Sequence, residues 1–397
     1  MSDLVIFGFL FAAIVIGWVL GRRSSVQAAA LNDYFSGRRD TRRTEDPSLD
    51  GMVEDLAADG GSAQTRIALG VQLRRRGEVD GAVRVHEDVL ARPGLAVDDA
   101  VRARLELARD YTSAGLLDRA EELLLELVQD FPEQARVGRM HLLEIYEIER
   151  DWQRAIDVAK ALLPRKLQRD RPAPGGMPER GQRPALRLAH YCCELAEEAR
   201  FSGDPGAARQ LLQDALSHDK QCVRASILLS QLEYDAGRYR EAAQALQRVR
   251  LQDPDYLPET IDLLRQCHDE LGDQQSLRTY LLECLALRPT PGLVAAVARD
   301  MARADGPAAA DRFLSEQLLK YPSLTGMAQL IGLQLQAAEG KPREEFAMLQ
   351  NLTHSLVASR PSYRCGHCGF AGKHLHWSCP GCKHWGSIKA IDGSGAG

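Results

Sequence analysis

Four cysteines near the C-terminus have the spacing of a metal site. Cys365 and Cys368 are followed, after ten intervening residues, by Cys379 and Cys382. Two cysteines three positions apart can grip one ion from a single tight turn, and two such turns complete a tetrahedral sulfur site. We therefore predict that the stretch from Tyr363 to Trp385 folds around one metal ion.

The residues beside the cysteines support this interpretation. Gly369 permits the left-handed backbone that the first turn needs, and Pro380 makes the second turn rigid. Because thiolates fill all four positions, no coordination site is open to a substrate, which favours a structural role. Zinc and iron both suit four thiolates, so the spacing leaves the metal open. Single-electron transfer is the alternative role if the metal is iron.

Histidines in the same stretch could replace a thiolate. Four cysteines in register make that unnecessary, so we expect the histidines to be surface residues. They are His367, His374, His376 and His384. A domain of this size has too little core to fold unaided, and the metal should supply much of its stability.

The composition of the whole chain favours helices. Its 397 residues suffice for two or more domains, aromatic residues are only 6%, and Ala, Leu, Arg and Glu are abundant. A formal charge of −5 gives no reason to expect nucleic acid as the main partner. An odd total of nine cysteines argues against a disulfide scaffold and favours a reducing compartment. The five cysteines outside the metal site fall in helical patterns: Cys192, Cys193, Cys222, Cys267 and Cys284.

A helical hairpin motif recurs along the middle of the chain. In most copies a glycine marks the turn, a small residue follows early in the second helix, and a proline often comes after it, as at Gly237, Ala242 and Pro254. These copies resemble the tetratricopeptide repeat, a hairpin of about 34 residues whose neighbours stack into a solenoid. A generic helical bundle is the alternative. The small position recurs at steps of 33 to 38 residues, with one step of 53, at Ala82, Ala120, Ala155, Ala208, Ala242, Leu277 and Ala310.

Two segments interrupt the repeat. The long step contains a stretch rich in proline and glycine, from Pro164 to Pro184, which we interpret as a flexible loop. Near the N-terminus, Asp33–Gly37 resembles the start of a repeat, but the charged run Arg38–Pro47 has no apolar stripe. We interpret this region as a degenerate first repeat or a linker.

The N-terminal segment is predicted to be a membrane anchor. Leu4 to Gly21 contains neither charge nor proline, and its eighteen residues would span roughly 27 Å as a helix. Arg22 and Arg23 follow at once, which places the body of the protein in the cytoplasm. A cleaved signal peptide, cut near Gln27–Ala30, is the alternative, but the segment lacks a basic region before its apolar core.

The repeats offer no catalytic set. The sequence contains no P-loop, no glycine-rich dinucleotide fingerprint and no His-Glu-x-x-His motif. Five histidines occupy helical positions without an evident acid or nucleophile partner in the sequence, and we expect them to be structural or exposed: His86, His141, His190, His218 and His268. A concave solenoid face usually binds segments of other proteins. We expect the aromatic residues of the metal site to cover it or to dock it on the last repeat: Tyr363, Phe370, Trp377 and Trp385.

The order of anchor, repeats and metal site resembles the lipopolysaccharide assembly protein B family of Gram-negative bacteria. The resemblance spans nearly the whole chain, with departures at the charged run and at the insertion. Its matching segments are Gly17-Trp18, Gly21–Ser24, Arg76–Asp80, Ala82–His86, Asp110-Tyr111, Ala114–Leu116, Asp118–Glu121, Trp152–Ala159, Tyr363–Cys365, Cys368–Phe370, Trp377–Cys382 and Trp385.

This resemblance implies a non-enzymatic adaptor on the cytoplasmic side of the inner membrane. Such an adaptor brings the deacetylase that commits carbon to lipid A to a membrane-anchored AAA protease, and it responds to a membrane protein that reports lipopolysaccharide level. A scaffold for lipopolysaccharide synthesis and export enzymes, or a rubredoxin-like redox protein, is the alternative. The resemblance assigns iron to Cys365, Cys368, Cys379 and Cys382.

We therefore predict an all-α protein, a tetratricopeptide-repeat solenoid with a transmembrane helix before it and a small rubredoxin-like metal knuckle after it. The predicted parts are an anchor (1–21), a linker or degenerate repeat (22–63), repeats (64–163), a flexible insertion (164–184), further repeats (185–358) and the metal-binding domain (359–397).

Overall fold

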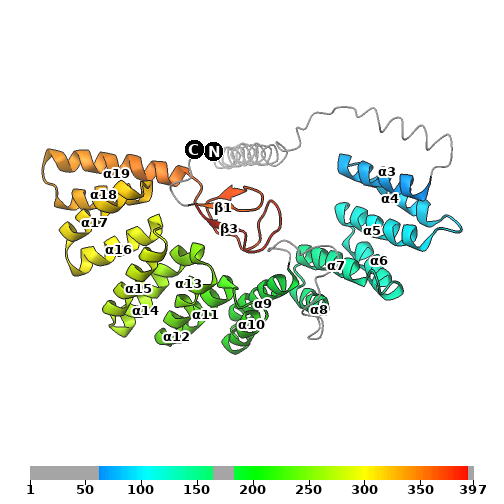
Figure 1. Ribbon diagram of the computed structural model, residues 1–397, viewed down its shortest axis with the longest axis horizontal. Helices are drawn as coiled ribbons and strands as arrows, with labels where there is room; N and C mark the ends of the chain where they lie inside the picture. Colours follow the sequence, from blue (N-terminus) through cyan, green and yellow to red (C-terminus); the bar gives the residue numbers. More distant parts are fainter. Residues whose placement is uncertain (1–61, 164–182, 392–397) are drawn as a thin grey trace, which may run out of the picture. The chain divides into compact units, whose positions relative to one another are not determined.

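The computed structural model describes residues 62–163 and 183–391, in two compact units that divide after Leu116 (Figure 1). The predicted anchor, its signal-peptide alternative and the predicted degenerate repeat lie outside the described residues, as does nearly all of the predicted insertion. Across the two described ranges, no helix is both long enough and apolar enough to cross a membrane.

The first unit consists of three helices, α3 (Ala63–Arg76), α4 (Val79–Leu90) and α5 (Val97–Ser113). Each of the three helices packs against the other two. Together they enclose a small core of Ile67, Val89 and Ala103. The imidazole of His86 is fully buried here, and its Nδ1 lies 2.5 Å from Oδ2 of Asp110. His86 therefore has an acid partner that the sequence did not reveal, and its role in this core is structural.

The second unit is a row of helices in which chain neighbours pack on one another, followed by a three-stranded sheet. Its elements are α6 (Leu117–Asp130), α7 (Ala135–Glu149), α8 (Trp152–Leu162), α9 (Pro184–Phe201), α10 (Pro205–His218), α11 (Val223–Asp235), α12 (Tyr239–Gln247), α13 (Val249–Gln252), the 3₁₀ helix η3 (Pro254–Thr260), α14 (Ile261–Leu271), α15 (Gln274–Leu287), α16 (Pro291–Ala304), α17 (Pro307–Lys320), α18 (Leu324–Ala337), α19 (Lys341–Ser359), β1 (Tyr363–Cys365), β2 (Ala371–Gly372) and β3 (Ile388–Ala390).

The small positions of the repeat are buried. All seven side chains expose 1% of their surface or less, and each lies in the second helix of a hairpin: Ala82, Ala120, Ala155, Ala208, Ala242, Leu277 and Ala310. A methyl group at this place lets two helices approach closely, while the larger Leu277 fills a wider gap. The helical, tetratricopeptide-like architecture predicted from the period is confirmed.

The turns follow the predicted chemistry. Gly237 follows α11 and has a φ of 72°. This left-handed backbone conformation costs glycine little free energy, because glycine has no side chain. The amide of Arg238 then donates to the carbonyl of Glu233, which satisfies a helix-end acceptor. At the start of α10 the Asp204 carboxylate accepts a hydrogen bond from the Ala207 amide, at 2.9 Å. These local contacts fix each hairpin before the hairpins stack.

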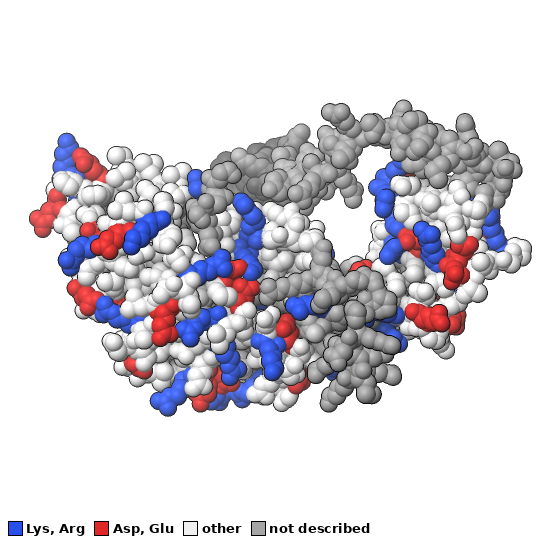
Figure 2. Space-filling model, viewed as in Figure 1, with Lys and Arg blue, Asp and Glu red and all other residues white. Residues whose placement is uncertain are grey.

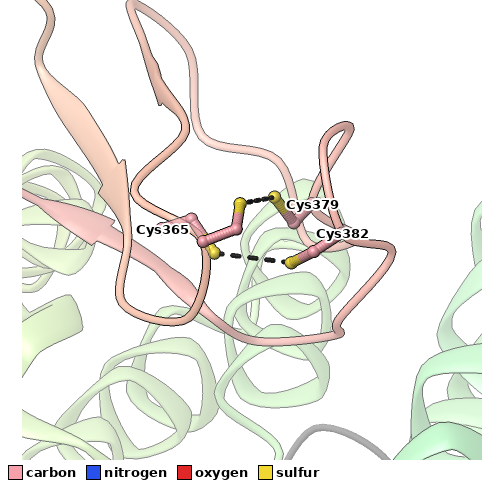
Figure 3. A group of neighbouring side chains, drawn as sticks. Cys365, Cys379 and Cys382 are labelled. Atoms are coloured by element: carbon pink, nitrogen blue, oxygen red, sulfur yellow. Dashed lines mark hydrogen bonds between the residues drawn. The ribbon is translucent and has the colours of Figure 1, made fainter. Parts of the chain in front are cut away.

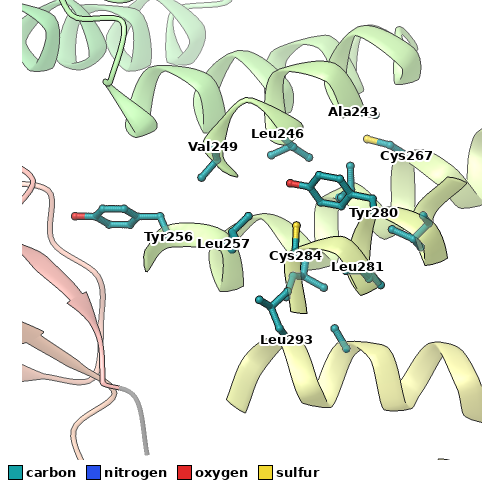
Figure 4. Close-up of a cluster of buried hydrophobic side chains, with 14 of the residues drawn as sticks. Ala243, Leu246, Val249, Tyr256, Leu257, Cys267, Tyr280, Leu281, Cys284 and Leu293 are labelled. Atoms are coloured by element: carbon teal, nitrogen blue, oxygen red, sulfur yellow. The ribbon is translucent and has the colours of Figure 1, made fainter. Parts of the chain in front are cut away.

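A large core cluster runs from α11 to α16 (Figure 4). Leu246, Leu257 and Leu264 are fully buried at its centre. Leu375 and Trp377 pack against the same cluster, although they come from the C-terminal region. The metal-site region is therefore not an appendage, because it shares a core with the solenoid.

One segment breaks the regular hairpin pattern. Between α12 and α14 the chain forms α13 and η3 in place of a simple turn. The sequence did not predict this, because the step from Ala242 to Leu277 has an ordinary length of 35 residues. Pro254 begins η3, and the carboxylate of Asp253 caps it. The segment contacts β3, so it is where the solenoid meets the sheet.

Candidate metal centre

The four predicted cysteines come together in one cluster (Figure 3). The sulfur atoms of Cys365 and Cys382 are 3.7 Å apart, as are those of Cys368 and Cys379, and all four lie within 4.8 Å of one another. An ion at about 2.3 Å from each sulfur in a tetrahedron would place neighbouring sulfurs about 3.8 Å apart. The donor set therefore fits one ion that prefers four thiolates.

A short sheet and two turns position these cysteines. Strand β1 pairs antiparallel with both β2 and β3, and Cys365 lies opposite Ile388. Gly369 has a φ of 76°, as its place after the first pair required. At the matching place after the second pair, Lys383 adopts a φ of 59°, one of two non-glycine residues with positive φ among those described. We call residues 363–390 the knuckle.

Hydrogen bonds prepare the sulfur atoms for a cation. Burial acts to raise the pKa of the Cys365 thiol, but Ser387 and the amides of Cys368 and His367 outweigh it and lower the pKa to about 6. The hydroxyl oxygen of Ser387 lies 3.3 Å from this sulfur. Burial raises the pKa of the Cys382 thiol, and hydrogen bonds with the other three cysteines raise it further, because thiolates crowd together without a compensating charge. A bound cation supplies that charge, which is why ligand thiols lose their protons when the metal binds.

One of the histidines, His384, is not the surface residue that we expected, whereas His367 is exposed as predicted. His384 is half-buried, and its ring stacks on that of His367 with 3.8 Å between centroids. Together with Cys382 they form a second group of close ligand atoms. His374 and His376 are exposed or nearly so. The stack lies next to Cys382, one of the four cysteines of the cluster.

Trp385 anchors the knuckle to the solenoid. Its side chain is 4% exposed, and its indole Nε1 donates to Oε1 of Glu147 on α7 at 2.8 Å. The same carboxylate oxygen accepts from the Tyr191 hydroxyl at 2.6 Å and pairs with the buried Arg187. Burial raises the pKa of the Tyr191 phenol, so it remains a donor. One carboxylate thus joins three elements.

His190 on α9 forms the other side of this contact. Its ring stacks on the indole of Trp385 with 4.9 Å between centroids. The imidazole is almost fully buried, and its Nδ1 has no hydrogen-bond partner among the described residues. Burial, with a smaller contribution from the Arg224 charge, lowers the pKa of His190 from 6.5 to about 3. The contact therefore requires a neutral histidine.

Helix η3 provides a second set of contacts. The Tyr256 hydroxyl donates to the backbone carbonyls of Gly386 and Ile388, and its ring stacks on that of Trp377. The ammonium of Lys389 pairs with Asp253 at 2.9 Å and also with Asp255. A cavity of about 450 Å³ remains between the knuckle and α9 and α11.

The docking place corrects one expectation. We predicted that the aromatic residues would cover the site or dock it on the last repeat. Tyr363 and Phe370 do pack against the cysteine cluster, but the knuckle lies against α7, α9 and η3, well before the last repeat. Tyr363 is the partial exception, because its hydroxyl donates to Glu259 at the end of η3. The binding residues on the solenoid side were missed because no local motif marks them: Glu147, His190, Asp253, Asp255 and Tyr256.

Acidification should loosen this docking. Undocked His190 binds a proton below pH 6.5, whereas the docked residue resists protonation until about pH 3. The contribution to docking is therefore complete above pH 6.5 and falls as the pH drops. Between pH 7 and pH 5 the docked state should lose about 2 kcal/mol. Hydrogen exchange of residues 363–390, followed across this pH range, measures the loss.

His190→Phe is the matched control for the pH experiment. Phenylalanine keeps a ring against Trp385 but cannot take up a proton, so the variant should lose most of the dependence between pH 7 and pH 5. Any pH dependence of docking that persists in His190→Phe belongs to other titratable groups, including the thiols. If hydrogen exchange of residues 363–390 changes equally with pH in the unchanged chain and in His190→Phe, His190 does not control docking.

Comparison with known proteins supports both parts of this architecture. The pattern of the family described as "Rubredoxin metal binding domain" matches residues 363–390, and that of "Tetratricopeptide repeat" matches residues 202–267. A four-cysteine, rubredoxin-like domain that binds one metal ion is therefore present at the C-terminus.

Two relatives are similar over almost the whole chain. "Lipopolysaccharide assembly protein B" of Escherichia coli (strain K12) is 33% identical over 98% of this chain and 98% of its own. The protein of the same name from Haemophilus influenzae (strain ATCC 51907 / DSM 11121 / KW20 / Rd) is 30% identical over the same shares. Among solved structures, a tetratricopeptide repeat protein from Parabacteroides merdae ATCC 43184 is 13% identical, covers 74% of this chain and 98% of its own, and has a TM-score of 0.34.

Proposed function

The chain belongs to the lipopolysaccharide assembly protein B family, and we propose that it acts in lipopolysaccharide assembly as an adaptor without catalytic activity of its own. Its relatives are named "Lipopolysaccharide assembly protein B", which supports the assignment to lipopolysaccharide assembly. A repeat architecture supports the adaptor role, because stacked helical hairpins offer long surfaces for segments of other proteins.

The observation that carries this proposal is the docking of the knuckle. Trp385 and Trp377 tie the metal site to helices that are far from it in sequence, through Glu147 and Tyr256. With four thiolates around it, the ion has no position left for a substrate. Its contribution is therefore to hold residues 363–390 in shape, so that the knuckle and the helices beneath it form one binding surface.

A finer proposal concerns the partners. We place the protein at the inner membrane, with the segment from Leu4 to Gly21 as a single-pass anchor and the repeats in the cytoplasm. There it delivers the deacetylase of the lipid A pathway to a membrane AAA protease and responds to a membrane protein that senses lipopolysaccharide. Tethering supports this role, because it raises the effective concentration of the adaptor near membrane partners.

Depletion of the protein should lengthen the half-life of the deacetylase. The reason is that proteolysis needs an adaptor to bring substrate and protease together. The half-life is measured after synthesis is stopped, in cells depleted of the chain and then supplied with it again. The matched control is the chain without residues 1–21, which should restore turnover only weakly. An unchanged half-life on depletion refutes the adaptor role, and capture of synthesis or export enzymes without the protease would favour a scaffold.

For the metal we propose iron, as the resemblance to the family implies. A ferric ion in four thiolates absorbs visible light, whereas a zinc ion does not, so the spectrum is taken after air oxidation. Metal analysis and an absorption spectrum of the purified chain test this assignment. One zinc ion per chain and a colourless protein would overturn it and would also exclude the rubredoxin-like redox role.

A further inference from the structure

Two buried cysteines of the solenoid lie side by side. Cys193 on α9 is fully buried, and Cys222, which directly precedes α11, is 3% exposed. Their sulfur atoms are 3.9 Å apart, although the two residues are 29 positions apart in the sequence. Helices α9 and α11 contact each other, so the pair connects two helices that are not neighbours along the chain.

The pair is too small a group to hold a structural metal ion. In the four-sulfur cluster, all ligand atoms lie within 4.8 Å of one another. Across residues 62–163 and 183–391, no third histidine, cysteine or carboxylate joins Cys193 and Cys222 in such a group. Two thiols would leave an ion that prefers four ligands two ligands short. The chemistry open to two neighbouring thiols is oxidation to a disulfide.

The surroundings of Cys222 favour its thiolate. The thiol of Cys193 lowers the pKa of Cys222, and the amide of Ala225 and the charge of Arg224 add to this effect against the cost of burial. Burial and the neighbouring sulfur raise the pKa of Cys193 well above its ordinary value. The proton between the two sulfurs therefore belongs to Cys193. A thiolate at a helix N-terminus and beside a cation is the reactive form of cysteine.

Cys222 is also the cysteine that a small molecule can reach. It lines the cavity of about 450 Å³ between the knuckle and helices α9 and α11, and Cys193 is not among the lining residues. Because so little of its surface is exposed, only a small reagent fits. On the face shown in Figure 2, acidic and basic groups lie side by side, so this surface does not steer a charged reagent. Hydrogen peroxide, which is small and uncharged, meets these conditions.

We propose that Cys222 and Cys193 form a reversible disulfide on exposure to hydrogen peroxide, with Cys222 reacting first. The Cys222 thiolate attacks one peroxide oxygen, the O–O bond breaks, and hydroxide leaves, which gives a sulfenic acid. The sulfur of Cys193 then attacks the sulfur of Cys222, the S–O bond breaks, and the departing hydroxide takes the proton of Cys193 to form water. Two electrons pass from the thiols to the peroxide, and a cellular dithiol returns them.

The bond needs only a local movement. A disulfide is about 2.05 Å long, so the two sulfurs must approach each other by roughly 1.9 Å. Side-chain rotation supplies part of this approach. Cys222 supplies the rest, because it stands before α11 and is not held within the helix. The bond then ties the start of α11 to α9, the helix that carries His190 beneath the knuckle.

Peptide mapping of the full, metal-loaded chain tests the bond. After peroxide treatment and alkylation of the free thiols, trypsin should release residues 188–200 joined to residues 221–224, and a dithiol should separate them. Cys192→Ala is the matched control, because Cys192 is the adjacent cysteine in the same peptide and is also 3% exposed. This variant should keep the linked product, whereas Cys193→Ala should lose it.

Trapping of the sulfenic acid tests the order of the two steps. In Cys193→Ala the second step is blocked, so dimedone, added as the treated chain is unfolded, should label Cys222. In Cys222→Ala, the protonated and less accessible Cys193 should stay a thiol. Labelling at position 222 should exceed labelling at position 193 by at least about tenfold.

Three results would overturn the proposal. The first is the absence of the linked peptides from the unchanged chain at peroxide concentrations that already release the metal. The second is a linked product that forms through Cys192, and so persists in Cys193→Ala. The third is equal labelling by dimedone at positions 193 and 222.

Discussion

Replacement of Cys379 by serine should release the metal and unfold the knuckle, while the helices of the second unit stay folded. Cys379 is fully buried, and its sulfur lies 3.7 Å from that of Cys368. A serine hydroxyl does not ionise at neutral pH, so three thiolates would remain. Loss of contacts around a ligand alone costs 10–100-fold in affinity, and we expect loss of the ligand itself to cost more than about 100-fold.

The unfolding follows from the size of the knuckle. Its strands are three, two and three residues long, and its own core is small. Structural zinc ions in small domains supply about 10–16 kcal/mol of apparent binding energy, which is also folding energy, and an iron ion in four thiolates should act in the same way. Without that energy, the conformational entropy of the unfolded chain should exceed the remaining stabilisation, and the knuckle should unfold. Metal content per chain and proteolysis of residues 363–390 measure the two effects separately.

Cys284→Ser is the matched control. Cys284 is also fully buried, but it lies in α15 and is not part of the four-sulfur cluster. This variant should lose some stability in the solenoid and keep its metal. Retention of a full metal complement by Cys379→Ser, or its absence from Cys284→Ser, would contradict the assignment of the ligands.

The parts of the structure that the sequence predicts well depend on local spacing. The interval of three between cysteines puts two thiols on one turn, and Gly369 takes the left-handed conformation that the turn requires. The recurring small positions predicted the buried sites of the hairpins for the same reason, because most of them follow a turn glycine within the same hairpin. These features need only a few neighbouring residues to determine them.

The docking of the knuckle could not be predicted in this way. Trp385 and Glu147 are 238 positions apart, and their contact depends on how several hairpins stack between them. Helix η3, which carries Tyr256, could not be predicted, because the repeat that contains it has an ordinary length. His190 looked like an ordinary helical histidine, and only its burial beside an indole shows its role. Long-range contacts of this kind leave no period in the sequence.

Replacement of Trp385 by alanine should detach the knuckle from the solenoid without loss of metal. The indole stacks on His190, meets Trp152 and Tyr191 edge-on, and donates to Glu147. Truncation of a buried tryptophan costs about 3–5 kcal/mol, which corresponds to more than about 100-fold in the docking equilibrium. Because none of these contacts involves a cysteine, the ion should stay bound.

Detachment is distinguished from unfolding by two measurements on the same sample. In the Trp385 variant, protease should cut faster between α19 and β1, while the metal content stays at that of the unchanged chain. Phe201→Ala is the matched control, because this aromatic residue is 97% exposed and should tolerate truncation. If the adaptor surface needs the docked knuckle, the detached variant should also fail to restore deacetylase turnover, even though it carries its metal. Restored turnover in a detached variant would mean that the knuckle binds its partner by itself, and loss of metal would mean that docking and metal binding form one folding unit.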